Sequence, residues 1–242
     1  MVYNSLIKIY SLITSCIRPQ NLPAILDSIV KAASLVKIPI HWYLVVDTRS
    51  SQYSEKAILD AKLKLLPPEG IILKWREFSD SYEKNWPVNI ALEEIVEGLV
   101  CILDDDNIMH PNYLSAISKV AGEKEIGILY DQLMGPNKSG NQQIRKVYRH
   151  LIQSGYIDAA QFTISRSLIG DTRWPSVPLG SKLHALLKGN SNPLGLDFQP
   201  DGIFIEKIYQ QHPTKFIIIS EPLCYFNHLS GGISSGNFSG NI

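Results

Sequence analysis

In the first half of the chain, short runs of consecutive apolar residues alternate with segments in which apolar residues recur every three or four positions. A continuous apolar run indicates a strand buried on both faces, and the wider spacing indicates a helix with one buried side. Strands that alternate with helices predict a mainly parallel sheet with helices on both faces. The predicted strands are residues 6–13, 41–46, 70–75 and 99–103, and the predicted helices are residues 21–35, 54–65, 87–96 and 111–120.

The pattern is less regular in the second half, where Gly, Pro, Asn and Ser interrupt the apolar runs. No linker separates two parts, so we expect one domain over residues 1–242 with an α/β first half and a mixed second half. The Gly/Ser-rich end, residues 231–242, is expected to be a flexible tail. Further predicted elements are strands at 126–133, 157–165 and 215–219, helices at 182–187 and 202–211, and loops at 135–143 and 170–195.

Composition narrows the possible partners. The chain has 242 residues, of which 45% are apolar, and this is enough for one large α/β domain with a full core. Its formal net charge is zero, so no basic excess points to nucleic acid or to an anionic membrane. Any phosphate group must therefore be bound by a local arrangement of a metal, a helix N-terminus or a few cations.

The three cysteines indicate a reducing compartment. Cys16, Cys101 and Cys224 are far apart, form no CxxC pair, and lie in or directly after apolar runs, so we interpret them as buried packing residues. The N-terminus lacks a basic start and a cleavage site, and no window reaches about 18 uninterrupted apolar residues. We expect a cytoplasmic protein with no membrane span, which leaves peripheral contact with a membrane open.

The strongest chemical signal is an acidic cluster directly after an apolar strand. Residues 99–103 run straight into Asp104, Asp105 and Asp106. Open α/β sheets bind ligands outside the carboxyl ends of their strands, and hard divalent cations prefer carboxylate oxygens. The cluster therefore predicts a metal site that holds a diphosphate. The alternative is a solvated acidic turn that caps the helix predicted from residue 111.

The segment LVCILDDDNIMHPNYL resembles the strand, DXD motif and following helix of GT-A glycosyltransferases, of the family 2 type and the related glucuronyltransferases. The resemblance implies a GT-A-like fold, a nucleotide-diphospho-sugar donor with UDP as the expected nucleotide, and Mn2+ or Mg2+. It further implies hexosyl or glucuronyl transfer to a glycan or small-molecule acceptor by an inverting displacement. Carried over, Asp104 or Asp105 would contact the ribose, and Asp106 would bind the metal.

Other segments of the first half match this family in the same order. SLITSCIRPQNLPAILDSI resembles its first strand, nucleotide loop and first helix, which places Thr14 and Arg18 at the nucleotide. HWYLVVDTRSS resembles a strand ending in the acid that reads the base, which would be Asp47. EKNWPVNIALEEI resembles the helix before the metal motif. The family often has Arg-Asn there, whereas this chain has Val88-Asn89, which keeps only Asn89 as a nucleotide contact.

Matches in the second half supply candidates for catalysis. YIDAAQFTISRSLI resembles the acceptor-side strand, and its Asp158 would either bind the acceptor or form a buried ion pair. PDGIFIEKI resembles the helix whose first acid is the catalytic base, which would be Asp201, although an N-cap role is also open. Glu206 and Asp197 are weaker candidates for the base. FNHLSGG resembles the late histidine that supports the metal, which would be His228.

The resemblance covers residues 5–230, with a nucleotide-binding half at 1–115 and an acceptor-binding half at 116–230. Two alternatives remain. A nucleotidyltransferase would normally carry a Gly-rich, basic phosphate loop after its first strand, but residues 14–19 contain no glycine. A non-catalytic relative that binds a sugar nucleotide or glycan would have little need for the intact acidic triplet.

Overall fold

The computed structural model describes residues 9–48, 54–78, 87–122, 125–136, 141–175 and 200–229. The helix predicted at 182–187, most of the loop predicted at 170–195, Asp197 and the tail predicted at 231–242 lie outside these residues.

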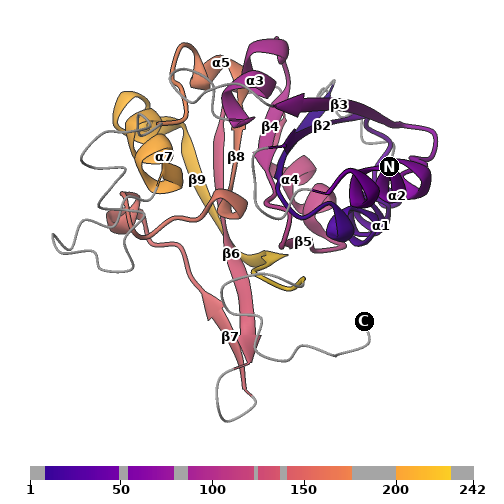
Figure 1. Ribbon diagram of the computed structural model, residues 1–242. Coiled ribbons are helices and arrows are strands. Elements are labelled where there is room, and N and C mark those ends of the chain that lie inside the picture. The colour runs from indigo at the N-terminus through magenta and orange to yellow at the C-terminus, as the bar shows by residue number, and fades with distance from the viewer. Residues whose placement is uncertain are drawn as a thin grey trace, which may run out of the picture.

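One mixed sheet forms the centre of the molecule (Figure 1). Its first four strands are parallel and neighbour one another in the order β3-β2-β1-β4. They are β1 (Tyr10–Cys16), β2 (Ile40–Asp47), β3 (Ile71–Phe78) and β4 (Leu99–Ile102).

The sheet continues from β4 in the order β8-β6-β9-β5, and β7 pairs with β6. Only β6 and β9 are parallel in this second half, because β8, β5 and β7 each run against their neighbours. The prediction of a parallel first half and a mixed second half is confirmed. The second-half strands are β5 (Ile108–Met109), β6 (Gly127–Pro136), β7 (Gln142–Arg145), β8 (Phe162–Ser165) and β9 (Phe216–Tyr225).

Helices cover both faces, and side chains alternate between the two cores along each strand. On β1, Leu12 packs in one core and Ile13 in the other. The first core is completed by α1 (Leu22–Ala33), α2 (Glu55–Lys64) and α4 (Tyr113–Ala121). The second is completed by α3 (Pro87–Glu94), α5 (Arg166–Ile169) and α7 (Pro200–Gln211). Figure 1 shows α1 and α2 on one side of the sheet and α7 on the other.

The antiparallel strand β8 decides which residues meet at the acidic cluster. Cys101 of β4 pairs with Thr163 of β8, so the residues that precede β8 lie where β4 ends. Leu129 of β6 pairs with Phe162, so the following residues of β6 reach the same place. The carboxyl end of β4, the turn before β8 and the middle of β6 thus converge at one edge of the sheet.

The predicted strand at 6–13 is displaced toward the C-terminus. In the described residues it begins at Tyr10 and continues to Cys16, through polar positions that the sequence assigned to a loop. Thr14 fits inside the sheet because its hydroxyl accepts a hydrogen bond from Trp42 Nε1 at 3.0 Å. A buried hydroxyl with a partner costs little, so the strand can run on.

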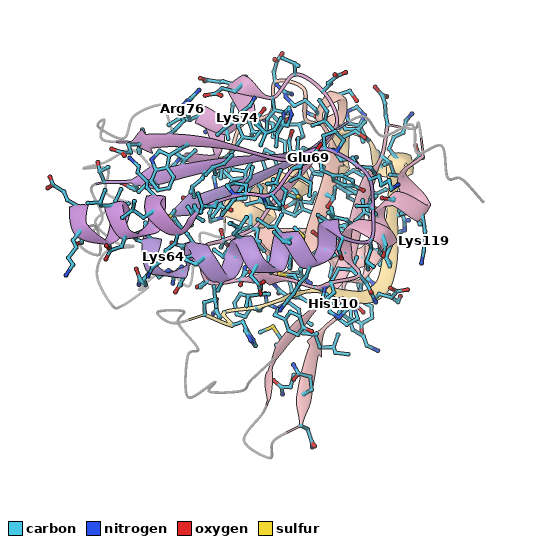
Figure 2. All side chains as sticks on the ribbon, turned by 90° about the vertical axis from the view of Figure 1, so that its right-hand side faces the viewer. Lys64, Glu69, Lys74, Arg76, His110 and Lys119 are labelled. Carbon is cyan, nitrogen blue, oxygen red and sulfur yellow. The ribbon has the colours of Figure 1, made fainter. Side chains whose placement is uncertain are left out.

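The predicted strand at 157–165 is wrong in its first part. Residues Ala159–Gln161 form a single 3-10 turn, and β8 begins only at Phe162. Asp158 and Gln161 cap this turn reciprocally, and this local bonding competes with extension of the strand. The predicted loop at 135–143 is also partly wrong, because its two ends belong to β6 and β7. These strands project from the body in both views (Figures 1 and 2).

The three thiols lie inside the protein, whereas many charged side chains outside the acidic segment lie at the periphery. Figure 2 shows Lys64, Arg76 and other labelled charged residues around the outside of the sheet and helices. Burial raises the pKa of all three thiols, that of Cys101 to about 12, as expected for buried packing residues. Among the described residues, the helices are too short or too polar to cross a bilayer.

Candidate active site

Asp105 is enclosed by hydrogen-bond donors. The Ile17 and Arg18 amides both donate to its Oδ2 at 2.6 Å, and the Arg18 guanidinium donates to its Oδ1. Asn21 Nδ2 donates to the Asp105 carbonyl at 2.8 Å. Asp105 is 1% exposed, and these bonds connect the loop after β1 to the end of β4. These donors favour an anchoring role for Asp105 over direct contact with a ribose.

Asp106 faces the same guanidinium from its other side. Arg18 Nη1 lies 3.0 Å from Asp106 Oδ2, so one cation serves two neighbouring acids. Burial raises the pKa of Asp106 above its ordinary value, against the opposing effect of Arg18. The pKa of Arg18 is raised, because its bonds to Asp105 outweigh the lowering effect of burial.

The segment that carries His228 is hydrogen-bonded to the acidic segment. Leu229 N donates to the Asp106 carbonyl at 2.9 Å, and Asn227 N donates to Asn107 Oδ1 at 2.7 Å. Asn227 has a φ of 47°, a left-handed conformation that asparagine tolerates better than most residues. The resulting turn places the two predicted metal ligands, Asp106 and His228, on adjoining segments. Asn107 Nδ2 is buried there with no hydrogen-bond partner among the described residues.

Asp104 belongs to a different group of acids. Oxygens from Asp104, Asp158 and Asp201 all lie within 4.8 Å of one another. They come from the end of β4, the turn before β8 and the first turn of α7. Burial, followed by the charges of Asp201 and Asp158, raises the pKa of Asp104 well above its usual range. Burial and then the charge of Asp158 raise the pKa of Asp201 to about 7.

The turn at 158–161 fixes two of these carboxylates. Asp158 Oδ1 accepts from Ala160 N at 3.0 Å, and Gln161 Oε1 accepts from Asp158 N at 3.1 Å. The intervening amide, Ala159 N, donates to Asp201 Oδ2 at 3.1 Å. One short turn therefore orients Asp158 by its cap and Asp201 by its backbone.

Two further residues at this group were not predicted as site residues. Gln132 Nε2 donates to Asp158 Oδ1 at 3.1 Å, and Arg145 Nη1 lies 3.6 Å from Asp158 Oδ2. The contact with Arg145 is the ion pair that was one of the two expectations for Asp158. The sequence indicates Gln132 only weakly, because it is a polar residue inside an apolar strand. Its partner cannot be read from the sequence.

The three remaining candidates, Asp47, Thr14 and Asn89, differ in their surroundings. Asp47 is the last residue of β2 and is 9% exposed. Thr14 is fully buried against Trp42. Asn89 Nδ2 donates to the Trp174 carbonyl at 3.1 Å, and Asn89 Oδ1 accepts from Trp174 N at 2.7 Å. The bonds of Thr14 and Asn89 favour structural roles, and the nucleotide contacts of all three stay predictions.

The structure also bears on two alternatives from the sequence, which are the acidic triplet as a helix cap and Glu206 as the base. The N-cap residue of α4 is Asn112, which lies several residues beyond the acidic triplet, so the acids do not start that helix. Glu206 Oε2 accepts from Ser154 N at 3.0 Å, one turn along α7 from Asp201. Glu206 is thus engaged with a loop, whereas Asp201 lies in the acidic group.

Comparisons with known proteins identify the fold. No protein-family model and no curated protein sequence matches the chain. Among solved structures, TarS 1–349 of S. aureus in complex with UDP-GlcNAc is similar, with a TM-score of 0.59 and 16% identity over 90% of this chain and 58% of that one. The mannosyltransferase PcManGT of Pyrobaculum calidifontis, in complex with GDP-Man and Mn2+, has a TM-score of 0.57 and 15% identity over 93% of this chain and 58% of that one.

This chain thus spans a little over half the length of each of these proteins. The identity is low, so the likeness shows a shared fold. The expected GT-A-like α/β fold is confirmed by these neighbours and by the sheet itself.

Proposed function

We propose that the chain is a metal-dependent glycosyltransferase that moves a sugar from a nucleotide-diphospho-sugar to an acceptor hydroxyl. The observation that carries the proposal is the position of Asp201, an oriented carboxylate with a pKa near neutrality beside the acidic segment at the carboxyl end of β4. In open α/β sheets this edge is where ligands bind. Two proteins of the same fold were solved with UDP-GlcNAc or with GDP-Man and Mn2+, which supports the same class of donor here.

The donor would bind across the ends of β1, β2 and β4. Asp47 would read the base, and Arg18, already held beside Asp106, would lie near the diphosphate. Arg18 brings a planar guanidinium with several donors, which suits phosphate oxygens. We keep UDP as the proposed nucleotide because the family resemblance in the first half implies it.

The residues at Asp106 fit the Mn2+ or Mg2+ that the fold implies. Asp106 offers carboxylate oxygen, which both ions prefer, and His228 offers imidazole nitrogen, which suits Mn2+ better. Burial lowers the pKa of His228, so its ring is neutral and able to ligate at neutral pH. A cation bound there would offset negative charge on the departing diphosphate.

Asp201 would act as the general base. The Ala159 amide fixes one carboxylate oxygen, so the other can face the acceptor. As the acceptor oxygen bonds to the anomeric carbon and the bond from that carbon to the diphosphate breaks, Asp201 would take the hydroxyl proton. A base whose pKa lies close to the working pH is efficient in such a transfer. A single displacement of this kind inverts the anomeric configuration.

A thermal-shift panel tests the donor assignment. UDP- and GDP-sugars are each added with and without Mn2+, and we expect stabilisation only when the metal is present. Asp106→Ala should abolish the shift, while Asp60→Ala, an exposed acid on α2, should retain it. If neither UDP- nor GDP-sugars stabilise the protein with Mn2+, the proposal fails. Hydrolysis of the stabilising donor then separates an enzyme from a protein that only binds sugar nucleotides.

A further inference from the structure

We propose that Asp158 is a positioning residue for the transfer reaction, because the turn that it caps holds the Asp201 carboxylate in place to take the proton of the acceptor. The inference rests on the proposed function, in which Asp201 is the general base. It gives Asp158 a part in the reaction beyond its ion pair with Arg145 and without direct contact with the acceptor.

Both carboxylate oxygens of Asp158 have partners inside the protein. Oδ1 accepts from Ala160 N at 3.0 Å and from Gln132 Nε2 at 3.1 Å. Oδ2 lies 3.6 Å from Arg145 Nη1. Gln132 and Arg145 are register partners on β6 and β7, so the sheet supports Asp158 at two adjoining points. A side chain bonded in this way is suited to holding its own turn.

The turn depends on this cap because it is short and irregular. It has only three residues, Ala159–Gln161, and the φ and ψ angles of Ala160, −85° and 18°, are not helical. Gln161 Oε1 accepts from Asp158 N at 3.1 Å, which completes a reciprocal cap with the bond from Ala160 N to Asp158. Removal of the Asp158 carboxylate would leave Ala160 N without its acceptor, so the turn should shift.

The base takes its orientation from the same turn. Ala159 N donates to Asp201 Oδ2 at 3.1 Å, and Ala159 is 1% exposed, so this amide is shielded from water. The helix that carries Asp201 has its own support, because Glu206 Oε2 accepts from Ser154 N at 3.0 Å. A shift of the turn would thus misplace the Asp201 carboxylate while α7 keeps its position.

A misplaced base should slow transfer more than it weakens substrate binding. A displacement of about 1 Å can lower a rate about 100-fold, so Asp158→Ala should lower kcat by about 10- to 100-fold with the donor KM unchanged. Asp158→Asn should stay within about threefold of the wild type, because asparagine is a good cap whose Oδ1 can still accept from Ala160 N and Gln132 Nε2.

The rates are compared at about pH 8, so that the base is ionised in each variant that retains it. The charge of Asp158 contributes, after burial, to raising the pKa of Asp201 to about 7. Above that value, loss of the Asp158 charge changes the ionised fraction of Asp201 little. Lys207→Ala, exposed on α7, is the control and should change neither kcat nor KM.

A double-mutant cycle distinguishes positioning from direct action on the acceptor. If Asp158 acts through the base, Asp158→Ala should have little further effect on kcat in a protein that already carries Asp201→Asn. A residue that bound the acceptor itself would keep its effect there. Gln161→Leu removes the other half of the cap and should show the same dependence on Asp201. It carries the test if Asp158→Ala does not fold by circular dichroism.

The Ala159 amide reports the geometry without any substrate. Its proton donates to the Asp201 carboxylate, so its nuclear magnetic resonance signal should move upfield in Asp201→Asn, where the acceptor of the bond is neutral. The same change should move the signal little when Asp158→Ala is also present, and fully when Asp158→Asn is present.

The inference is overturned if Asp158→Asn loses as much kcat as Asp158→Ala, or if Asp158→Ala lowers kcat equally with and without the Asp201 carboxylate. Equal movement of the Ala159 signal in the wild-type and Asp158→Ala backgrounds would overturn it as well. Failure of the proposed function looks different, because UDP- and GDP-sugars would be neither transferred nor hydrolysed by the wild type, while the Ala159 signal would still respond to Asp201→Asn.

Discussion

The Arg18 guanidinium donates to Asp105 Oδ1 from both Nε and Nη2, at 2.8 and 2.5 Å. Two backbone amides donate hydrogen bonds to the other oxygen, Oδ2, so both oxygens of Asp105 have partners inside the protein. The three consecutive acids therefore have separate surroundings. Asp105 anchors a loop, Asp106 faces Arg18 and the His228 segment, and Asp104 faces Asp158 and Asp201.

Removal of Arg18 should destabilise the fold strongly. Arg18→Ala leaves Asp105 buried without its charged partner, and breaking a buried pair in this way costs about 3–5 kcal/mol. Arg76→Ala is the matched control, because Arg76 makes a similar two-point contact with Glu94 on the exposed surface. Exposed pairs contribute up to about 1 kcal/mol. Urea unfolding of both variants checks the difference, and equal losses would contradict a buried anchor.

Replacement of Asp104 by asparagine should stabilise the protein at neutral pH. The folded-state pKa values of Asp104 and Asp201 are raised, so the folded protein holds protons that the unfolded chain releases above about pH 4. Stability should therefore fall as pH rises from about 4 to about 7, where Asp201 ionises in the folded protein. Asp104→Asn removes one of the two carboxyls that hold these protons and should flatten this fall.

Thermal melts of wild type and Asp104→Asn at about pH 4 and about pH 7.5 measure the effect of the Asp104 carboxyl. The two proteins should melt together at the lower pH, and the variant should melt several degrees higher at the upper pH, at roughly 2–4 °C per kcal/mol. A variant that melts lower at both values would show that Asp104 has a stabilising partner.

Asn89 should stabilise the segment at Trp174. Its amide group satisfies both backbone groups of that residue, and Trp174 itself packs on Phe204 with ring centroids 5.0 Å apart. Asn89→Ala leaves a buried N–H and a buried C=O unpaired, each worth about 1–3 kcal/mol. We expect the midpoint of urea unfolding to fall with the slope unchanged. Glu93→Ala, exposed on the same helix, is the control.

Gly202 should be intolerant of a side chain. A Cβ at this position would lie 2.6 Å from the Ser154 Cα, so alanine forces α7 away from the loop at 153–155. Overpacking of this kind costs about 1–3 kcal/mol. The helix carries Asp201, so Gly202→Ala should also lower kcat with any acceptor found. Lys207→Ala, exposed on α7, should do neither.

Much of the fold is readable from the sequence because its first half follows a simple rule. Four apolar runs become β1 to β4, and the acids after residue 103 lie at the carboxyl end of β4, as the family resemblance implied. The displaced first strand shows the limit of that rule. Thr14 and Ser15 look like loop residues. Only the hydrogen bond that Trp42 Nε1 donates to the Thr14 hydroxyl explains why the strand continues through them.

The grouping within the site depends on tertiary pairing. Asp158 meets Asp104 because β8 runs antiparallel to β4, and Gln132 joins them because β6 runs antiparallel to β8. Neither direction is encoded in local periodicity. The sequence also does not show which of the three adjacent acids has which role. The position of Arg18 distinguishes Asp105 from its neighbours.

The buried cysteines have a practical consequence for measuring this molecule. All three thiols are enclosed and have raised pKa values, so they should react slowly with maleimides and nitroxide reagents under native conditions. A cysteine introduced at an exposed position such as Tyr156 would then carry a spin label alone, without prior removal of the native thiols. The distance from such a label to a bound Mn2+ would then test whether the ion lies at the acidic segment.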